Sequence, residues 1–393
     1  MSEIPLSDAR ARWSSAQGLD TPVDEPIAAT LELTGWVRTL GGLAGYLALS
    51  ARNPSATVEA VNEAVASGAI GVSPAVRGCI YLVPRSHEAL ALKVAHLLSA
   101  RRIAKEQEKL DVSDAELDAV GEAVLSLVSE TPLSTAQLRK RLPEGTVRSL
   151  GDAGKKMGVT STLPPALRRL EFAGRLRRTP IDARLDHERY VWAPHDLEVG
   201  RATEDDLAQL AALYLRWAGP STRKELASWT GLNQTQAKKA LAACGAETAT
   251  LGGDEVFVGS DPCRDATGHV AWLPAMDNLY ALRAASLPLV DPAYADVEVS
   301  NFGSGGRSTL GKMSQPIERT IVRDGEVLGM WAWDPAADEI VLSLSPRGKD
   351  LGIDAERARV EGVIQQVGHG KVFSLDTDAR MTQRADRLRS LTW

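Results

Sequence analysis

The sequence predicts an α+β protein in which three tandem winged-helix domains precede a β-rich, barrel-like C-terminal domain. Three observations support this prediction. A chain of 393 residues is too long for one hydrophobic core. The pattern Pro-x-Ser/Thr-x-x-x-Leu occurs twice, at residues 131–138 and 219–226. Each copy follows an amphipathic helical pattern and precedes a helix and a hairpin pattern, which together give the winged-helix order.

The third unit, residues 201–262, shows this order most clearly. A long amphipathic helical pattern opens the unit, and a capping box of Thr222 and Glu225 starts its second helix. Residues 233–245 predict a third helix. Residues 247–258 predict a hairpin, because a Gly-Gly pair separates two short strand patterns.

The second unit, residues 109–200, repeats the plan with a longer insertion. Ser134 and Gln137 form the corresponding capping box. Residues 164–174 predict the third helix, which starts with two prolines at positions where no N–H is needed. Residues 175–192 then predict a basic hairpin, so this unit has the same order of elements as the third.

The first unit, residues 1–108, is a fainter copy. Helical patterns cover residues 24–35, 41–51 and 56–68, and strand patterns follow within residues 71–84. This order again predicts a winged helix. The first unit therefore completes a series of three.

Residues 263–393 form the predicted β-rich C-terminal domain. An Asp324-Gly325 pair between apolar segments is a strong hairpin signal. Within this domain, residues 303–314 approach the phosphate-loop pattern, but Met313 stands where that pattern needs Ser or Thr. Pro316 and strand-like residues follow instead of a helix. We therefore expect no nucleotide cofactor.

Composition points to a cytoplasmic protein with no membrane partner. The chain contains no run of 18 apolar residues, and its N-terminus lacks the layout of a signal peptide. Three cysteines without a CxxC pair, and six histidines without metal-ligand spacing, argue against a disulfide framework and a zinc site. We expect no cofactor and no bound metal.

The charge of the chain is unevenly distributed, which suggests a polyanion-binding face. The net charge is −6, yet residues 139–189 contain thirteen Lys or Arg against six Asp or Glu. A solvated surface that happens to be rich in arginine is the alternative. The candidate contacts to duplex DNA in the third helix and wing of the second unit are Arg168, Arg169, Arg175, Arg177 and Arg178.

Three further residues are candidate DNA contacts. Gln234 and Lys238 lie on the predicted third helix of the third unit, which in this fold suits the major groove. Arg77 starts a wing strand of the first unit and suits a phosphate or a structural role equally well. Trp36 fits a core position or a base-stacking position.

Five segments in this order resemble the AlkZ/YcaQ-like winged-helix DNA glycosylase family. The segments are residues 35–52, 77–84, 216–232, 272–283 and 322–333. The resemblance implies three stacked winged helices and a barrel-like C-terminal domain. It also implies hydrolysis of the N-glycosidic bond of alkylated bases, including N7-alkylguanines and cross-links, in double-stranded DNA. Asp277 matches a family position of unassigned role.

The resemblance fails at the family's catalytic pair, which reads Gln-x-Gln or Gln-x-Asp. Arg38 and Leu40 stand at these two positions. Leu40 cannot hydrogen-bond a water, and the charge of Arg38 opposes a cationic base. We therefore expect a nucleoid-associated protein that binds duplex DNA without excising bases. The alternatives are an active glycosylase for a different base, with Arg38 polarising it, and a winged-helix transcriptional regulator.

Overall fold

The first part of the chain contains four helices and a three-stranded antiparallel sheet. The computed structural model describes residues 2–259, 268–283, 287–300, 307–313 and 317–393. The helices and strands expected between residues 24 and 84 are present, and the sheet has the order β1-β3-β2. The elements are α1 (Leu6–Ala16), α2 (Ile27–Thr34), β1 (Val37–Arg38), α3 (Ala44–Ser50), α4 (Val58–Ala66), β2 (Ile70–Pro74) and β3 (Ile80–Pro84).

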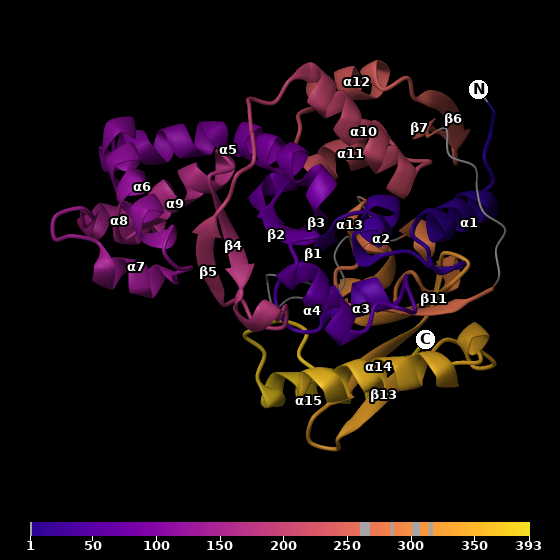
Figure 1. The fold of residues 1–393 in the computed structure, drawn as a ribbon. Helices are drawn as coiled ribbons and strands as arrows, with labels where there is room; N and C mark the ends of the chain where they lie inside the picture. The colour runs from indigo at the N-terminus through magenta and orange to yellow at the C-terminus, as the bar shows by residue number, and fades with distance from the viewer. Residues whose placement is uncertain (1, 260–267, 284–286, 301–306, 314–316) are drawn as a thin grey trace.

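A long helix, α5 (Glu88–Leu110), was not expected from the sequence and connects the first unit to the second. Its N-terminal half buries Leu90, Ala91 and Val94 against the first and third units. Its C-terminal half is rich in charged residues and packs against helices of the second unit (Figure 1). The N-terminal half of this helix therefore belongs to the core, and much of its C-terminal half lies on the surface.

The second unit has the expected order, with one additional helix. Ser134 and Gln137 form the predicted capping box, and prolines stand at the start of α9 as expected. The additional helix, α8, occupies the insertion. This unit has its own apolar core, formed by residues between Leu110 and Trp192. Its elements are α6 (Asp114–Val128), α7 (Thr135–Arg141), α8 (Gly151–Met157), α9 (Leu163–Phe172), β4 (Leu176–Pro180) and β5 (Tyr190–Pro194).

The third unit follows its prediction closely. The capping box of Thr222 and Glu225 is formed, and Gly231 ends α11 in the left-handed conformation with a φ of 87°. The paired strands β6 and β7 turn at the two expected glycines. The elements are α10 (Glu204–Ala218), α11 (Arg223–Thr230), α12 (Gln234–Ala243), β6 (Glu247–Leu251) and β7 (Asp254–Val258).

The C-terminal part is built on an open sheet with the strand order β13-β12-β11-β8. The expected hairpin at Asp324-Gly325 joins β11 to β12, and both turn residues have positive φ. No sheet among the described residues closes into a barrel, because β8 and β13 remain edges and helices cover the faces. The elements are β8 (Val270–Leu273), α13 (Asn278–Ala281), β11 (Arg319–Arg323), β12 (Glu326–Asp334), β13 (Glu339–Leu344), α14 (Asp354–Val367) and α15 (Asp378–Arg389).

The first and C-terminal parts share hydrophobic cores. One cluster joins Leu31 and Leu47 to Trp272 and Trp331, so the first helices pack on the C-terminal sheet. Helix α14 also contacts α3 and α4 (Figure 1). A second cluster joins Trp36 to Trp217 and Trp229 of the third unit. The second unit is thus the only one with a largely separate core among the described residues.

The position of Trp36 excludes the base-stacking alternative in this conformation. Its side chain is 1% exposed and packs between Trp217 and Trp229, with ring centroids 5.6 and 6.2 Å away. Its indole N–H donates to Nδ1 of His87 at 3.1 Å. Trp36 is a core residue of the junction between the first and third units.

The segment that approaches a phosphate loop is only partly described, because residues 303–306 and 314 lie outside the described residues. Its described part begins with β10 (Arg307–Thr309), which pairs antiparallel with β9 (Glu298–Ser300). A single 3₁₀ turn, Leu310–Lys312, follows β10 in place of the helix that a phosphate loop needs. The described part of this segment therefore differs from a phosphate loop.

Within the described ranges, no helix is both long and apolar enough to cross a membrane.

Candidate functional site

The two positions that carry the resemblance to a catalytic pair lie at the edge of the first sheet. Arg38 ends β1, stands opposite Tyr81 of β3 and is partly buried. The next residue, Thr39, donates its backbone N–H to the carbonyl of Ile80 at 3.1 Å. Burial raises the pKa of Tyr81 to about 12, so its hydroxyl stays protonated. Arg38 and Leu40 therefore sit on a backbone fixed by strand pairing.

A C-terminal segment, residues 370–376, covers the loop that follows; we call this segment the strap. The N–H of Ser374 donates to the carbonyl of Leu40 at 3.1 Å, and the N–H of Leu43 donates to the carbonyl of Lys371 at 3.0 Å. A Cβ atom on Gly42 would lie 2.6 Å from the carbonyl oxygen of Val372. Only glycine allows this close approach, and the φ of 59° favours it too.

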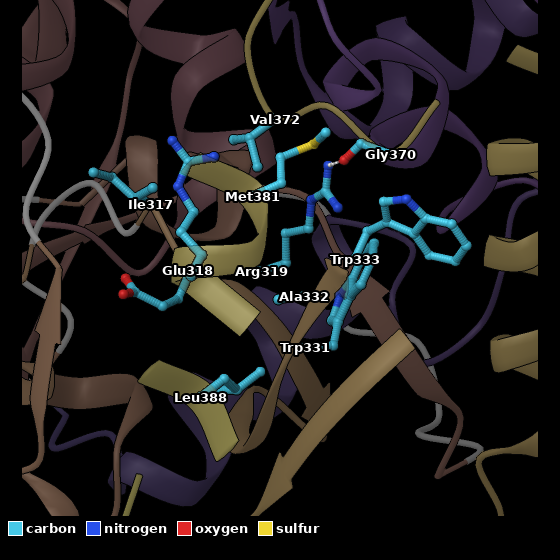
Figure 2. Close-up of a pocket in the computed structure, with 11 residues that line it drawn as sticks. Ile317, Glu318, Arg319, Trp331, Ala332, Trp333, Gly370, Val372, Met381 and Leu388 are labelled. Carbon is cyan, nitrogen blue, oxygen red and sulfur yellow. Dashed lines mark hydrogen bonds between the residues drawn. The ribbon is translucent and has the colours of Figure 1, made fainter. Parts of the chain in front are cut away.

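A buried arginine holds the start of the strap. Arg319 points from β11 toward the strap, and its Nη2 donates to the carbonyls of Gly370 and Lys371 at 2.8 and 2.9 Å (Figure 2). Its guanidinium lies over the Trp331 ring, 4.5 Å from the centroid. Burial, aided by the charge of Arg384, lowers the pKa of Arg319 to about 9. The group is still cationic at neutral pH and fixes the strap in place.

The cavity beside Arg319 is too small for a base. It has a volume of about 30 Å³ and lies between β11, β12 and α15 (Figure 2). A space of that size can hold water and is far below the several hundred Å³ of an ordinary ligand pocket. This cavity therefore has no room for a flipped nucleotide. A separate hollow of about 600 Å³ borders the strap at Gly370 and is lined by Trp333 and His369.

Two carboxylates secure the rest of the strap and the wing beside it. Asp376 accepts the backbone N–H groups of Val372 and Phe373 and a bidentate pair from Arg384. Asp186 accepts from Arg184 and His369, and its own carbonyl accepts the N–H of Gly42 at 2.7 Å. Burial alone would raise the pKa of Asp186, but these partners hold it well below its ordinary value. The loop after Arg38 is thus enclosed by two ordered segments.

Four of the five arginines predicted to grip DNA are paired with carboxylates of the protein itself. Arg178 makes two bonds of 2.7 Å to Glu171, which is buried. Arg177 is partly buried, with its guanidinium beside Gly68. The other pairs are Arg168 with Glu106 at 2.5 Å, Arg169 with Asp114 and Asp118 at 2.8 Å each, and Arg175 with Glu122 at 2.7 Å.

Arg77, Gln234 and Lys238 lie on neighbouring elements and are exposed. Arg77 has a φ of 57° in the turn between β2 and β3, and its side chain lies against Gly231 at the end of α11. Gln234 and Lys238 stand on α12, where Gln234 accepts from Arg223 at 3.0 Å. The β2–β3 turn of the first unit and the helices α11 and α12 of the third unit therefore contribute to one region.

The sequence reading missed a row of cations on α5. Arg101, Lys105 and Lys109 are spaced by four residues, so they share one helix face, and all three are exposed. The spacing itself was the signal that could have identified them. The basic segment identified from the sequence, residues 139–189, does not include this helix.

Asp277, which had no assigned role, has a structural one. Its carboxylate makes a bidentate pair with Arg52, at 2.7 and 2.9 Å, and both side chains are fully buried. Arg52 also donates to the carbonyl of Ala48 and to Gln17. The Arg52 Nη atoms are bonded, and its buried Nε has no hydrogen-bond partner among the described residues. The pair ties the first unit to the C-terminal part.

Comparisons with known proteins agree with the resemblance. The profile of the family described as DNA glycosylase AlkZ-like matches residues 41–369, beginning directly after Leu40 and ending directly before the strap. The structure is similar to that of the Streptomyces sahachiroi DNA glycosylase AlkZ, with a TM-score of 0.68 and 17% sequence identity, over 94% of this chain and 98% of that chain. A comparison with curated proteins gave no match. Since the profile spans most of the sequence, the chain belongs to the AlkZ-like DNA glycosylase family.

Proposed function

We propose that this protein binds double-stranded DNA, including alkylated DNA, without hydrolysing the N-glycosidic bond. Membership of the AlkZ-like family supports a DNA partner and a role connected with repair. The three sets of helices and hairpins support a winged-helix reading of residues 1–108, 109–200 and 201–262, followed by the C-terminal part, residues 263–393. A DNA-bound state would also place the protein on the nucleoid.

The observation that carries the proposal is the chemistry at positions 38 and 40. The Leu40 side chain is apolar, and its carbonyl already accepts the N–H of Ser374. Thr39 has a hydroxyl but is 3% exposed, and a hydroxyl without a neighbouring base is a poor activator of water. This loop therefore lacks the pair of polar side chains that could hold and orient an attacking water.

The charge of Arg38 also opposes excision of the lesions that the family removes. N7-alkylguanine is cationic, and two positive charges about 4 Å apart repel by about 4 kcal/mol at an effective dielectric constant of about 20. A penalty of that size corresponds to roughly a thousandfold in a rate or a binding constant. Arg38 is therefore better suited to a phosphate than to a cationic base.

Among the predicted contacts, we place the main weight on Arg77, Gln234 and Lys238. Arg77 suits a phosphate, and the two α12 side chains suit a groove of the duplex. Arg168, Arg169, Arg175 and Arg178 would first have to exchange a carboxylate for a phosphate. We propose that these four, with the partly buried Arg177, contribute less than their number suggests.

The test uses duplexes with and without a single N7-methylguanine. We expect no abasic sites above the protein-free control, together with binding to both duplexes that weakens steeply with salt. Catalytic release of the base by the unmodified protein would overturn the lack of excision. A footprint confined to one sequence would favour the regulator alternative, and no binding at low salt would overturn the DNA partner.

A double substitution, Arg38→Gln with Leu40→Gln, tests whether the loop explains the loss of activity. We expect measurable release of N7-methylguanine from a protein that binds the duplex as tightly as the unmodified chain. The matched control is Leu40→Met, which keeps the position apolar. A double variant that binds but releases no base would show that the side chains at 38 and 40 are not the cause.

A further inference from the structure

One face of the C-terminal half of α5 carries a row of cations that the proposed function does not yet use. Arg101, Lys105 and Lys109 recur every four residues, and the eight residue steps from the first to the last span about 12 Å at the rise of an α-helix. Within the described part of the chain, none of the three has a carboxylate within ion-pair distance. Their charges are therefore available to a partner.

This row borders a groove between α5 and the end of α8, which we call the α5 groove. Its volume is about 750 Å³. Leu98 and Met157 supply apolar surface, and four cations face one carboxylate, Glu106. Glu106 is already bonded to Arg168 at 2.5 Å, so it does not neutralise the row. The fourth cation is Arg102, which lies 3.6 Å from Glu106.

The shape and charge of the α5 groove fit an extended polyanion better than a small anion. The three cations form a straight row and do not converge on one point. Such a row matches negative charges that recur along a nucleic-acid strand. One strand of B-DNA has a phosphate every 3.4 Å along the axis, so a row of about 12 Å faces three or four phosphates. The stems of the lysines can lie along Leu98 and Met157 while their ammonium groups reach outward.

We propose that the α5 groove binds the phosphate backbone of duplex DNA, away from the loop at residues 38–43. This inference rests on the proposed function, because it names a further contact surface for the same partner. It adds phosphate contacts on α5, which lies outside residues 139–189, to the contact proposed for Arg77. Figure 1 shows α5 along the edge of the molecule, beside the helices of the second unit.

The experiment compares two variants with the same change in net charge. Lys105→Glu with Lys109→Glu alters the groove, whereas Lys312→Glu with Lys349→Glu alters two exposed lysines of the C-terminal part. Duplex affinity is measured by fluorescence anisotropy from 50 to 300 mM salt, and thermal unfolding checks that both variants fold. The full-length protein is used throughout.

We expect the groove variant to lose roughly 50-fold in affinity at about 0.1 M salt and its salt slope to fall by about 1.8, from two lost contacts of about 0.9 each. We expect the control to stay within about twofold of the unmodified protein because its lysines lie outside the groove. Protection of Lys105 and Lys109 from an amine-reactive label by bound duplex, read by mass spectrometry, gives the same answer without substitution.

The outcomes separate the two proposals. If the unmodified protein binds duplex DNA and the groove variant binds equally well, the α5 groove is excluded and the proposed function stands. Equal weakening of both variants also excludes the groove, because it reflects overall charge. If the unmodified protein binds no duplex at low salt, the proposed function fails and this inference fails with it.

Discussion

Two basic regions of the molecule lie side by side and differ in what their charges can do. Helix α9 and the wing after it carry arginines that bond to carboxylates of α5, α6 and α9 itself. The adjacent C-terminal half of α5 carries three cations, Arg101, Lys105 and Lys109, with no such partners among the described residues, whereas Arg102 lies 3.6 Å from Glu106. The region with more basic residues in the sequence is thus the one with fewer charges available.

The difference shows that the number of basic residues in a segment does not say how many of their charges are free to bind a phosphate. A paired arginine must give up a charge-assisted hydrogen bond before it can bind a phosphate, whereas an exposed lysine gives up only water. Pairing depends on the faces that the fold brings together, and α6 presents Asp114, Asp118 and Glu122 to the second unit's arginines. The comparison therefore predicts opposite responses to substitution in the two regions.

The largest effect is expected where a paired arginine is buried. Arg178→Ala would leave the Glu171 carboxylate, which is 3% exposed, without its partner. We expect a loss of about 3 to 5 kcal/mol in the free energy of unfolding of the second unit. The measurement is urea denaturation followed by tryptophan fluorescence, since Trp192 lies beside Arg178.

The matched control for that prediction is Arg175→Ala. Arg175 and Glu122 are both well exposed, so we expect a much smaller loss than for Arg178→Ala. Equal losses in the two variants would contradict the distinction between the buried and the exposed pair.

A smaller effect, on DNA affinity, is expected when the exposed Arg175–Glu122 ion pair is broken. Glu122→Gln removes the carboxylate that holds Arg175, so the guanidinium becomes available to a phosphate. We expect duplex affinity to rise by up to about eightfold at about 0.1 M salt, the value of one phosphate contact. Glu130→Gln is the control, because it changes net charge equally at an exposed glutamate that has no arginine partner among the described residues. A rise of the same size in the control would mean that only net charge matters.

The smallest effect concerns pH. The hydrogen bond and the charge of Arg175 lower the pKa of Glu122 below its ordinary value, so its carboxylate stays ionised throughout the neutral range. The affinity ratio between Glu122→Gln and the unmodified protein is therefore expected to stay constant from pH 8 to pH 6. It converges toward one only as the pH falls through that lowered pKa. Anisotropy titrations at three pH values check this, and a ratio that already declines at pH 6 would contradict the pairing.

Local signals in the sequence were sufficient for many elements of the fold. Capping boxes at Ser134 and Thr222 and the Asp324-Gly325 turn formed as predicted, because each depends on residues within one turn of chain. Helices α14 and α15 were missed in a region expected to be β-rich. Their segments carry many charges, and α15 in particular is held by packing on β12 and by ion pairs with Asp334 and Asp376.

The residues at the candidate site could be predicted from the sequence, but the segments and ion-pair partners that surround them could not. Arg38 and Leu40 could be identified from the sequence, whereas the strap that covers their loop comes from more than 300 positions away. The partners of Arg168 and Arg175 are 62 and 53 residues distant. Contacts at such separations have no periodic signal, so the arginines were interpreted as available when they are paired.

The Arg52–Asp277 pair has a consequence for where the protein can be truncated. A fragment that stops after the second unit would keep a guanidinium in a dry interior with no counter-ion, and the complementary fragment would keep the orphaned carboxylate. We expect both pieces to be destabilised by such a cut, however modular the repeated helices look. Variants that keep Arg52 and Asp277 in one chain avoid this loss.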